Sequence, residues 1–163
     1  MSMPQTNHTT PPSRQGAALL ISPAERDHQI LGNLFREQNW TLYSAHSLGS
    51  ACAMLRRRVV PVVITERDLP DGDWRGVLEA VHSLPSPPLV IVTSLKADER
   101  LWAEALNLGA YDVLAKPFSR TELIRVLGSV WIRCKPTSNR SRAPEPPFAG
   151  GRPVILVISV PLT

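Results

Sequence analysis

Polar side chains that could do chemistry stand at or just after the ends of short apolar runs. They are Ser22, Glu66, Thr93 with Ser94, and Lys116, and the apolar Pro23 follows Ser22 at the same kind of position. If these positions meet in the folded protein, they form a crevice that holds one carboxylate, several hydroxyl groups and one ammonium group. A lysine ammonium beside a single carboxylate forms an ion pair, and we expect Glu66 to be the nearest anion to Lys116. We also expect that pair to be partly exposed, which limits its net contribution to under about 1 kcal/mol.

An alternation of strands and helices would position these residues. Apolar runs predict strands at residues 17–21, 41–45, 59–65, 89–93 and 111–115, and amphipathic patterns predict a helix after each, including 74–84, 98–108 and 119–131. Residues 66–73 are predicted to form a polar loop. Alternating strands and helices indicate a parallel sheet covered on both faces, whose functional site lies beyond the carboxyl ends of the strands.

Helix start signals follow two of the strands. Ser22, Pro23 and Glu25 match a capping box, with serine as N-cap, proline at the first helical position and glutamate at the third. The predicted apolar face of this helix consists of Ile30, Leu31, Leu34 and Phe35. Ser47 is predicted to cap the next helix.

Composition excludes several classes of protein. The chain has 163 residues, 43% of them hydrophobic and 20% charged, which is typical of one globular domain. The formal net charge of +4 comes from the ends of the chain, because residues 16–134 hold 13 basic and 13 acidic residues. We therefore expect no specific nucleic-acid binding and no membrane association. Cys52 and Cys134 form no disulfide or metal-site pattern, so a reducing, cytoplasmic location is expected.

The chain divides into three parts. Residues 1–16 are rich in Pro, Thr and Ser and are predicted to be a disordered tail. Residues 17–134 form the predicted domain. Residues 135–163 are a Pro-rich, basic tail with an apolar end at 153–163, and too few to form a further enzyme or DNA-binding domain.

Three sequence blocks resemble the receiver domain of response regulators, the CheY-like fold. They are residues 63–72 (VITERDLPDG), residues 90–94 (VIVTS) and residues 109–118 (GAYDVLAKPF). The resemblance covers about residues 16–134 and implies a flavodoxin-like α/β fold with a five-stranded parallel sheet in the order 2-1-3-4-5. It also implies bacterial two-component, or phosphorelay, signalling.

The departures from the receiver pattern concern the phosphorylation site. A receiver holds Mg²⁺ with two acidic residues after its first strand, and here those positions are Ser22 and Pro23. Glu25 and Asp27 are not expected to replace them, because both lie on the following helix. The phosphoacceptor position is Glu66, and Asp68 is out of register with it. The resemblance therefore implies a pseudo-receiver that has lost Mg²⁺ and needs no cofactor.

The switch residues of a receiver are also altered. Thr93 matches the switch hydroxyl and Lys116 the lysine that contacts the phosphoryl group, whereas Val113 stands where many receivers have an aromatic residue. Valine is stiff and too short to swing, so one resting conformation is expected. Glu66 carries about one negative charge and mimics a phosphorylated aspartate only in part.

Trp102 is the candidate interface residue. Leu101, Ala105 and Leu108 form the inward stripe of its helix, and Trp102 lies about 100° from Leu101, toward the flank. We expect an interaction module that recognises a histidine kinase or another regulator through its fourth helix, fifth strand and fifth helix. A weak homodimer is a further expectation for that face.

Two alternatives to this interpretation stay open. The first is a functional receiver that is phosphorylated at Glu66 or Asp68. The second is an enzyme or nucleotide-binding protein on a flavodoxin-like fold, and it is disfavoured because the 22–25 turn has no glycine. The four histidines lie on a tail, two helices and a strand end and form no catalytic set, so we expect no enzyme activity.

Overall fold

The structure is a computed structural model that describes residues 16–134. Its strands are β1 (Ala17–Ile21), β2 (Thr41–Ala45), β3 (Val62–Glu66), β4 (Asp68–Leu69), β5 (Gly72–Asp73), β6 (Leu89–Ser94) and β7 (Asp112–Ala115). Its helices are α1 (Glu25–Glu37), α2 (Leu48–Arg57), α3 (Trp74–His82), α4 (Glu99–Asn107) and α5 (Arg120–Cys134). The predicted tails, 1–16 and 135–163, lie outside the described residues apart from Gly16.

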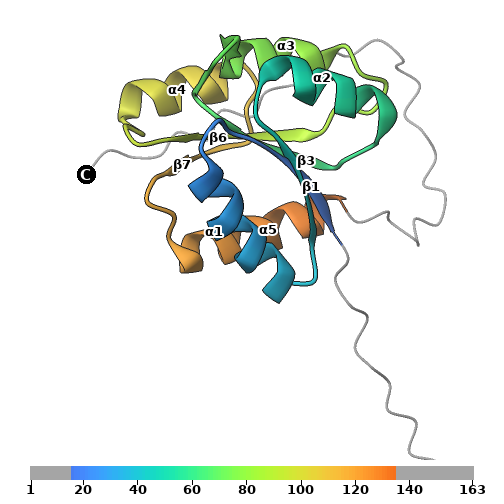
Figure 1. Cartoon of the computed structure of the whole chain (residues 1–163). Helices are drawn as coiled ribbons and strands as arrows, with labels where there is room; N and C mark the ends of the chain where they lie inside the picture. The colour runs from blue at the N-terminus through green and yellow to red at the C-terminus, as the bar shows by residue number, and fades with distance from the viewer. Residues whose placement is uncertain (1–15, 135–163) are drawn as a thin grey trace, which may run out of the picture.

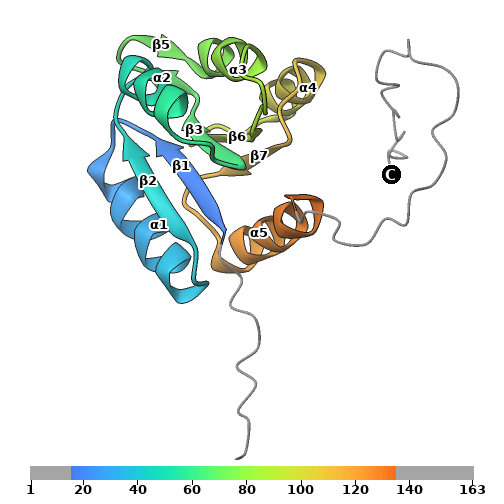
Figure 2. The same ribbon diagram turned by 90° about the vertical axis from the view of Figure 1, so that its right-hand side faces the viewer.

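Five strands form one parallel sheet in the order β2-β1-β3-β6-β7. Strands β4 and β5 form a separate two-stranded antiparallel hairpin. Without that hairpin, the order is the predicted 2-1-3-4-5, so the predicted fold class is confirmed. Helices α1 and α5 cover one face of the sheet and α2, α3 and α4 cover the other (Figures 1 and 2).

Alternate residues of each strand enter two apolar cores. Leu19 and Ile21 belong to the core under α2, α3 and α4, whereas Ala18 and Leu20 belong to the core under α1 and α5. All four side chains are at most 1% exposed. Strands buried on both faces are expected to be continuous apolar runs, which is the pattern that made them recognisable in the sequence.

The third strand begins and ends later than predicted. Val59 is 85% exposed and β3 starts at Val62, because Pro61 has no N–H to donate to a strand ladder. Glu66 is the last residue of β3 rather than the first of a loop, since it pairs with Thr93 of β6. The other strands and helices begin or end within one to three residues of their predicted limits, as is usual for frayed ends.

The predicted capping box at Ser22 is wrong. Helix α1 starts at Glu25 with Ala24 as N-cap, and no side chain caps it. The Ser22 hydroxyl instead accepts a hydrogen bond from the Ala24 N–H at 3.1 Å and donates to Asp27 at 2.7 Å. Ile30, predicted to face inward, is 36% exposed. The capping role predicted for Ser47 is confirmed, because its hydroxyl accepts from the Ser50 N–H.

Candidate functional site

The carboxyl ends of the central strands bring the predicted crevice residues together. Glu66 ends β3, Thr93 lies on β6, and Lys116 follows β7. The Thr93 hydroxyl lies 3.3 Å from the Thr65 carbonyl oxygen and 3.4 Å from Glu66 Oε2. The backbone N–H of Lys116 donates a hydrogen bond to the backbone carbonyl of Ser94 at 3.0 Å, so the chain after β7 is fixed beside β6.

Lys116 forms ion pairs with two carboxylates. Its ammonium group contacts Glu66, as predicted, and it also lies 2.5 Å from Oδ2 of Asp27. The side chains of Lys116, Asp27 and Glu66 are 12%, 9% and 15% exposed. The pair of Lys116 and Glu66 is therefore partly exposed, as expected, although α1 and the strand ends enclose most of the three groups.

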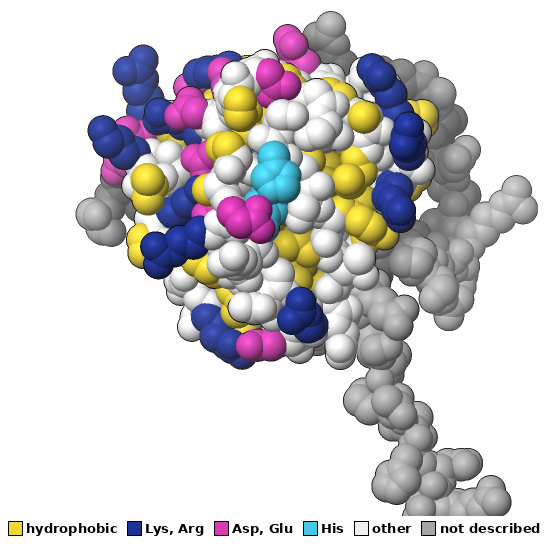
Figure 3. All heavy atoms as spheres, in the orientation of Figure 1, with side chains coloured by type: hydrophobic (Ala, Val, Ile, Leu, Met, Phe, Trp, Pro, Cys, Tyr) yellow, Lys and Arg dark blue, Asp and Glu magenta, His cyan; other side chains and the backbone are white. Residues whose placement is uncertain are grey.

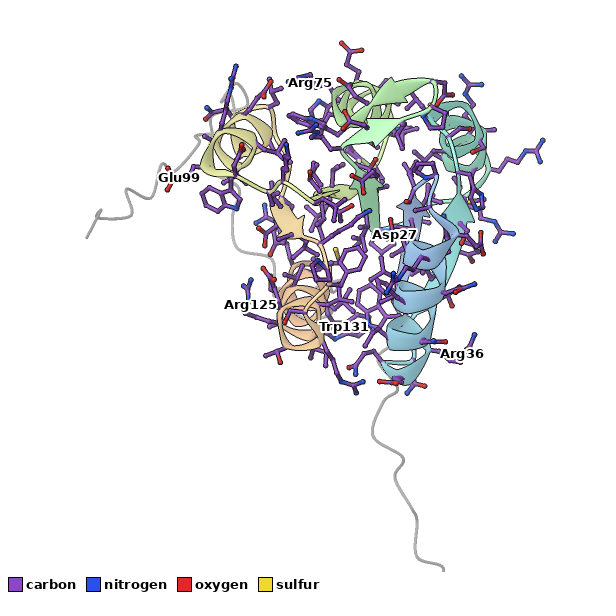
Figure 4. All side chains as sticks on the ribbon, turned by 60° about the vertical axis from the view of Figure 1, so that its left-hand side comes forward. Asp27, Arg36, Arg75, Glu99, Arg125 and Trp131 are labelled. Atoms are coloured by element: carbon purple, nitrogen blue, oxygen red, sulfur yellow. The ribbon has the colours of Figure 1, made fainter. Side chains whose placement is uncertain are left out.

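Asp27 is the site residue that sequence reasoning missed. We expected it to lie away from the crevice because it belongs to the helix after β1. Helix α1 begins at Glu25, so Asp27 is in the first turn, and helical side chains tilt toward the helix N-terminus. Figure 4 shows Asp27 pointing from α1 toward the strand ends, whereas Arg36 of the same helix points outward.

Ser22 and His28 hold this first turn in place. The Ser22 hydroxyl donates to the same Asp27 oxygen that Lys116 contacts. His28 is buried, and its Nε2 lies 2.9 Å from the Ser22 carbonyl, which can only accept a hydrogen bond. His28 Nδ1 lies 3.0 Å from the Ser44 hydroxyl. Ser22, predicted as a degenerate metal position, thus fixes the Asp27 carboxylate.

The expectation that the histidines are scattered is wrong for two of them. The rings of His28 and His46 lie 4.3 Å apart between centroids, because β1 and β2 are neighbouring strands. His46 Nε2 lies 3.3 Å from the exposed Glu25 carboxylate. The ring nitrogens of His28 are both engaged with Ser22 and Ser44, so the pair has a structural role in the hydrogen-bond network.

The electrostatics of the crevice favour charged lysine. Burial by itself lowers the pKa of Lys116, but hydrogen bonds to Asp27 and Glu66 and the charges of both carboxylates outweigh it, so the pKa is raised. Two carboxylates and one ammonium leave the crevice with one net negative charge. Within residues 16–134, no group of three or more His, Cys, Asp or Glu side chains is arranged to hold a metal ion.

The remaining predicted positions lie outside this ion-pair cluster. Pro23 is exposed and has no side-chain ligand atom. Asp68 is 72% exposed and pairs with its neighbour Arg67 at 2.9 Å. Val113 is 6% exposed and packs in the core under α2, α3 and α4, as an ordinary strand valine would.

The segment after β3 anchors two helices, a role that sequence reasoning did not assign. The Asp71 carboxylate accepts hydrogen bonds from the N–H groups of Leu48 and Gly49 at the start of α2, and these bonds lower its pKa. Asp73 is the N-cap of α3 and pairs with Arg75. Arg75 also contacts Glu104 of α4, and these carboxylates raise the pKa of its guanidinium group. The hairpin is thereby tied to α2 and α3, and Arg75 joins α3 to α4.

Helix α4 presents the predicted interface residue. Trp102 is 47% exposed, as expected for the flank of the helix. Leu101 and Ala105 are buried, but Leu108, predicted to face inward, is also 47% exposed because it is the C-cap where the helix ends. Helix α4 lies against β7 (Figures 1 and 2). In Figure 3, acidic and basic side chains are interspersed on the left of the visible face, whereas basic side chains alone stand along its right-hand edge.

Comparison with known proteins identifies the family. Residues 24–128 match the response regulator receiver domain, so the chain belongs to this family. It is 29% identical over 126 residues to a protein-glutamate methylesterase/protein-glutamine glutaminase of Anaeromyxobacter dehalogenans, covering 70% of this chain and 36% of the relative. It is 25% identical over 132 residues to the two-component response regulator-like protein APRR3 of Arabidopsis thaliana, covering 78% of this chain and 26% of the relative. The chain thus spans about a third or less of these relatives.

A solved structure shows the same fold. The response regulator structure from Chloroflexus aurantiacus aligns with a TM-score of 0.69 at 20% identity, covering 73% of this chain and 99% of that one. The chain is therefore a receiver domain of the two-component type, and receiver domains interact with signalling proteins such as histidine kinases. In the part of the chain described here, no helix is both long and apolar enough to cross a membrane.

Proposed function

We propose that this receiver domain is a protein-interaction module that signals without aspartate phosphorylation. The observation that carries the proposal is the position of the Lys116 ammonium, which is bound by Asp27 and Glu66 together. In this arrangement the fixed positive charge of a lysine is shared by both carboxylates of the crevice and offsets one of their two negative charges. No phosphodonor, metal or cofactor is needed to maintain it.

The donor atoms of the crevice do not fit Mg²⁺. This ion requires near-octahedral oxygen coordination and is usually held through carboxylates. Asp27 Oδ2 and Glu66 Oε2 are already engaged by the ammonium group of Lys116. Ser22 directs its hydroxyl to Asp27, and Pro23 has no ligand atom. A magnesium ion would have to displace Lys116, so no step of this proposal uses one.

The acceptor position is equally unsuited to phosphoryl transfer. Glu66 is one methylene longer than aspartate, and its carboxylate is held by Lys116 and lies within hydrogen-bond reach of Thr93. Phosphoryl transfer depends on in-line placement of the nucleophile and on metal ions that neutralise charge. A misplacement of about 1 Å can reduce a rate about 100-fold. Glu66 therefore serves as an ion-pair partner in this proposal.

The switch is fixed in one arrangement. Thr93 already lies beside the Glu66 carboxylate and the Thr65 carbonyl, and Val113 is packed in the core. A ligand shifts a conformational equilibrium only if it binds two states differently. With no phosphoryl group or metal to bind, the domain keeps one resting conformation.

The surface formed by α4, β7 and α5 is the proposed contact with a histidine kinase or another regulator. Trp102 and Leu108 are half exposed there, and tryptophan is enriched among residues that dominate binding energy. A weak homodimer would use the same surface. Since no catalytic set is assembled among residues 16–134, we propose a binding role and no enzyme activity, in the cytoplasm.

Intact-mass spectrometry of the full chain with acetyl phosphate and Mg²⁺ tests the proposal. We expect no added phosphoryl group on the wild type, on Glu66→Gln or on Asp68→Asn. Stoichiometric phosphorylation that disappears in Glu66→Gln or in Asp68→Asn would instead establish a receiver with an unconventional acceptor. A response regulator with an ordinary aspartate site, treated in parallel, confirms that the phosphodonor is active.

A further inference from the structure

An apolar groove lies at the end of the sheet opposite the crevice. It consists of two adjoining hollows of about 360 Å³ and 110 Å³ that share Val59, Val60 and Ser86. We call it the amino-end groove, because it flanks the starts of β3 and β6. Its lining comes from the end of α2, the segments 59–61 and 84–89, and Arg133 and Cys134 at the end of α5.

The groove is apolar and preformed. Val59, which is 85% exposed, is the most exposed large apolar side chain among those identified in residues 16–134. The Pro61 carbonyl accepts a hydrogen bond from the Leu89 N–H at 2.9 Å, which fixes the starts of β3 and β6 together. Prolines in the 85–88 turn restrict its backbone, so little conformational entropy is lost when the groove is covered.

The chain itself carries an apolar segment in the sequence that follows the last helix of the domain. Helix α5 ends at Cys134, whose side chain lines the larger hollow, so residue 135 leaves the domain at the groove. After 19 mostly polar or proline residues, 135–153, the sequence reads VILVISV at 154–160. This segment has no charge and begins with five large aliphatic residues in succession, which suits an apolar groove whose charged lining residues are Arg58 and Arg133.

We propose that residues 154–160 of this chain dock in the amino-end groove. The 19 residues between Cys134 and Val154 can extend to about 65 Å, and a random coil of that length has a root-mean-square span of roughly 24 Å. A tether of this length gives an effective concentration on the order of 1 mM. If the untethered segment bound the groove with a Kd of only about 1 mM, the tethered segment would then be docked half of the time.

This docking does not depend on the state of the crevice. The groove lies at the amino ends of β3 and β6, whereas Glu66 and Thr93 lie at their carboxyl ends. Covering Val59 would remove an exposed aliphatic surface from the domain while leaving the α4, β7 and α5 surface free. The inference would therefore stand if the proposed signalling function were wrong.

Amide signals of the ¹⁵N-labelled full chain test the contact. Val59→Asp places a carboxylate in the groove, at a position so exposed that the fold should tolerate it. We expect the signals of residues 154–160 to shift in this variant. They should not shift in Leu95→Asp, a matched control that is 78% exposed in the loop after β6. Unchanged signals of residues 154–160 in Val59→Asp would overturn the proposal.

Disulfide trapping decides whether the segment docks on its own chain. Two variants are made in a Cys52→Ser background, one with Ser159→Cys and the other with Ala149→Cys. The rate at which each new cysteine forms a disulfide with Cys134 is measured and divided by the rate of the same variant in urea. Docking should make Cys134 react about tenfold faster with position 159 than with position 149, although 149 is nearer in sequence. An undocked chain would give equal normalised rates at the two positions, because the division by the rate in urea removes the effect of loop length. Equal normalised rates, or disulfide-linked dimers in place of monomers, would overturn docking in cis.

Discussion

Asp27 and Lys116 stand 89 positions apart in the sequence, and their charged groups meet at 2.5 Å beyond the strand ends. The contact joins α1 to the segment after β7 across the width of the crevice. Because Lys116 contacts Glu66 as well, one ammonium group links β3, α1 and the β7–α5 connection. The chemistry of the crevice is therefore that of an internal ion-pair cluster.

Removal of the ammonium group should be strongly destabilising. Lys116→Met leaves the carboxylates of Asp27 and Glu66 largely buried without their counter-ion. Breaking a buried ion pair by removing one partner costs about 3 kcal/mol or more. We expect a loss of this size in the free energy of unfolding, measured by urea denaturation at neutral pH.

Two matched variants limit the interpretation of that loss. Asp27→Asn keeps a hydrogen-bond acceptor beside Lys116, so we expect a smaller loss of about 1 kcal/mol. Arg120→Ala breaks the ion pair with Glu37, whose partners are 60% and 49% exposed, and should cost under about 1 kcal/mol. If Lys116→Met were no more destabilising than Arg120→Ala, the ion-pair cluster would have no special role.

Alkaline pH should weaken the same cluster. The pKa of Lys116 is raised in the folded protein above its ordinary value of 10.5, so its charge stabilises the fold fully below that pH. The difference in unfolding free energy between wild type and Lys116→Met should be constant from about pH 7 to pH 10 and shrink above about pH 11. Urea denaturation across this range measures it. A difference that grows above pH 11 would contradict the account.

Acid should remove a separate contribution at the start of α2. Hydrogen bonds from the N–H groups of Gly49 and Leu48 lower the pKa of Asp71 below 3.8, so this stabilisation is present above that pH and is lost as pH falls. Asp71→Asn should therefore be less stable than wild type above about pH 5, with the difference disappearing below about pH 3. Chemical denaturation at both pH values checks this. An undiminished difference in acid would argue against the hydrogen bonds as its cause.

The crevice was predictable from the sequence only where residues lie at strand ends. Apolar runs buried on both faces located β1, β3, β6 and β7, and parallel strands bring their carboxyl ends to one edge. The contact of Glu66 with Lys116 and the position of Thr93 followed from that topology. The exposure of Trp102 followed from helical periodicity alone.

Asp27 could not be found in this way because its position depends on where α1 begins. The Ser-Pro-x-Glu pattern predicts a start at Pro23, but Ser22 donates to Asp27 and the first turn forms from Glu25. A shift of two residues rotates the helix by more than half a turn and changes which side chains face the sheet. The proximity of His28 and His46 was missed for the same reason. The strand β2 was predicted beside β1, but the face of α1 on which His28 lies depends on where the helix begins.

Partner binding should depend on Trp102 and not on phosphodonors. Trp102→Ala should weaken binding to a partner captured from source cells by about 2 kcal/mol or more if tryptophan anchors the interface. Its 47% exposure predicts little change in unfolding free energy, and Leu95→Asp in the preceding loop is a control for surface substitution. Unchanged partner affinity and self-association in Trp102→Ala would move the interface away from α4.

The central claim is that Ser22, Pro23 and Glu66 leave the crevice unable to bind Mg²⁺ and a phosphoryl group. Beryllofluoride, a phosphoryl analogue, can be added with Mg²⁺ to the ¹⁵N-labelled full chain while its amide signals are recorded. We predict no shift in the wild type at residues 22, 66, 93 and 116. The triple variant Ser22→Asp, Pro23→Asp, Glu66→Asp, which supplies the missing carboxylates, should respond at these positions. A saturable response of the wild-type crevice would contradict the account.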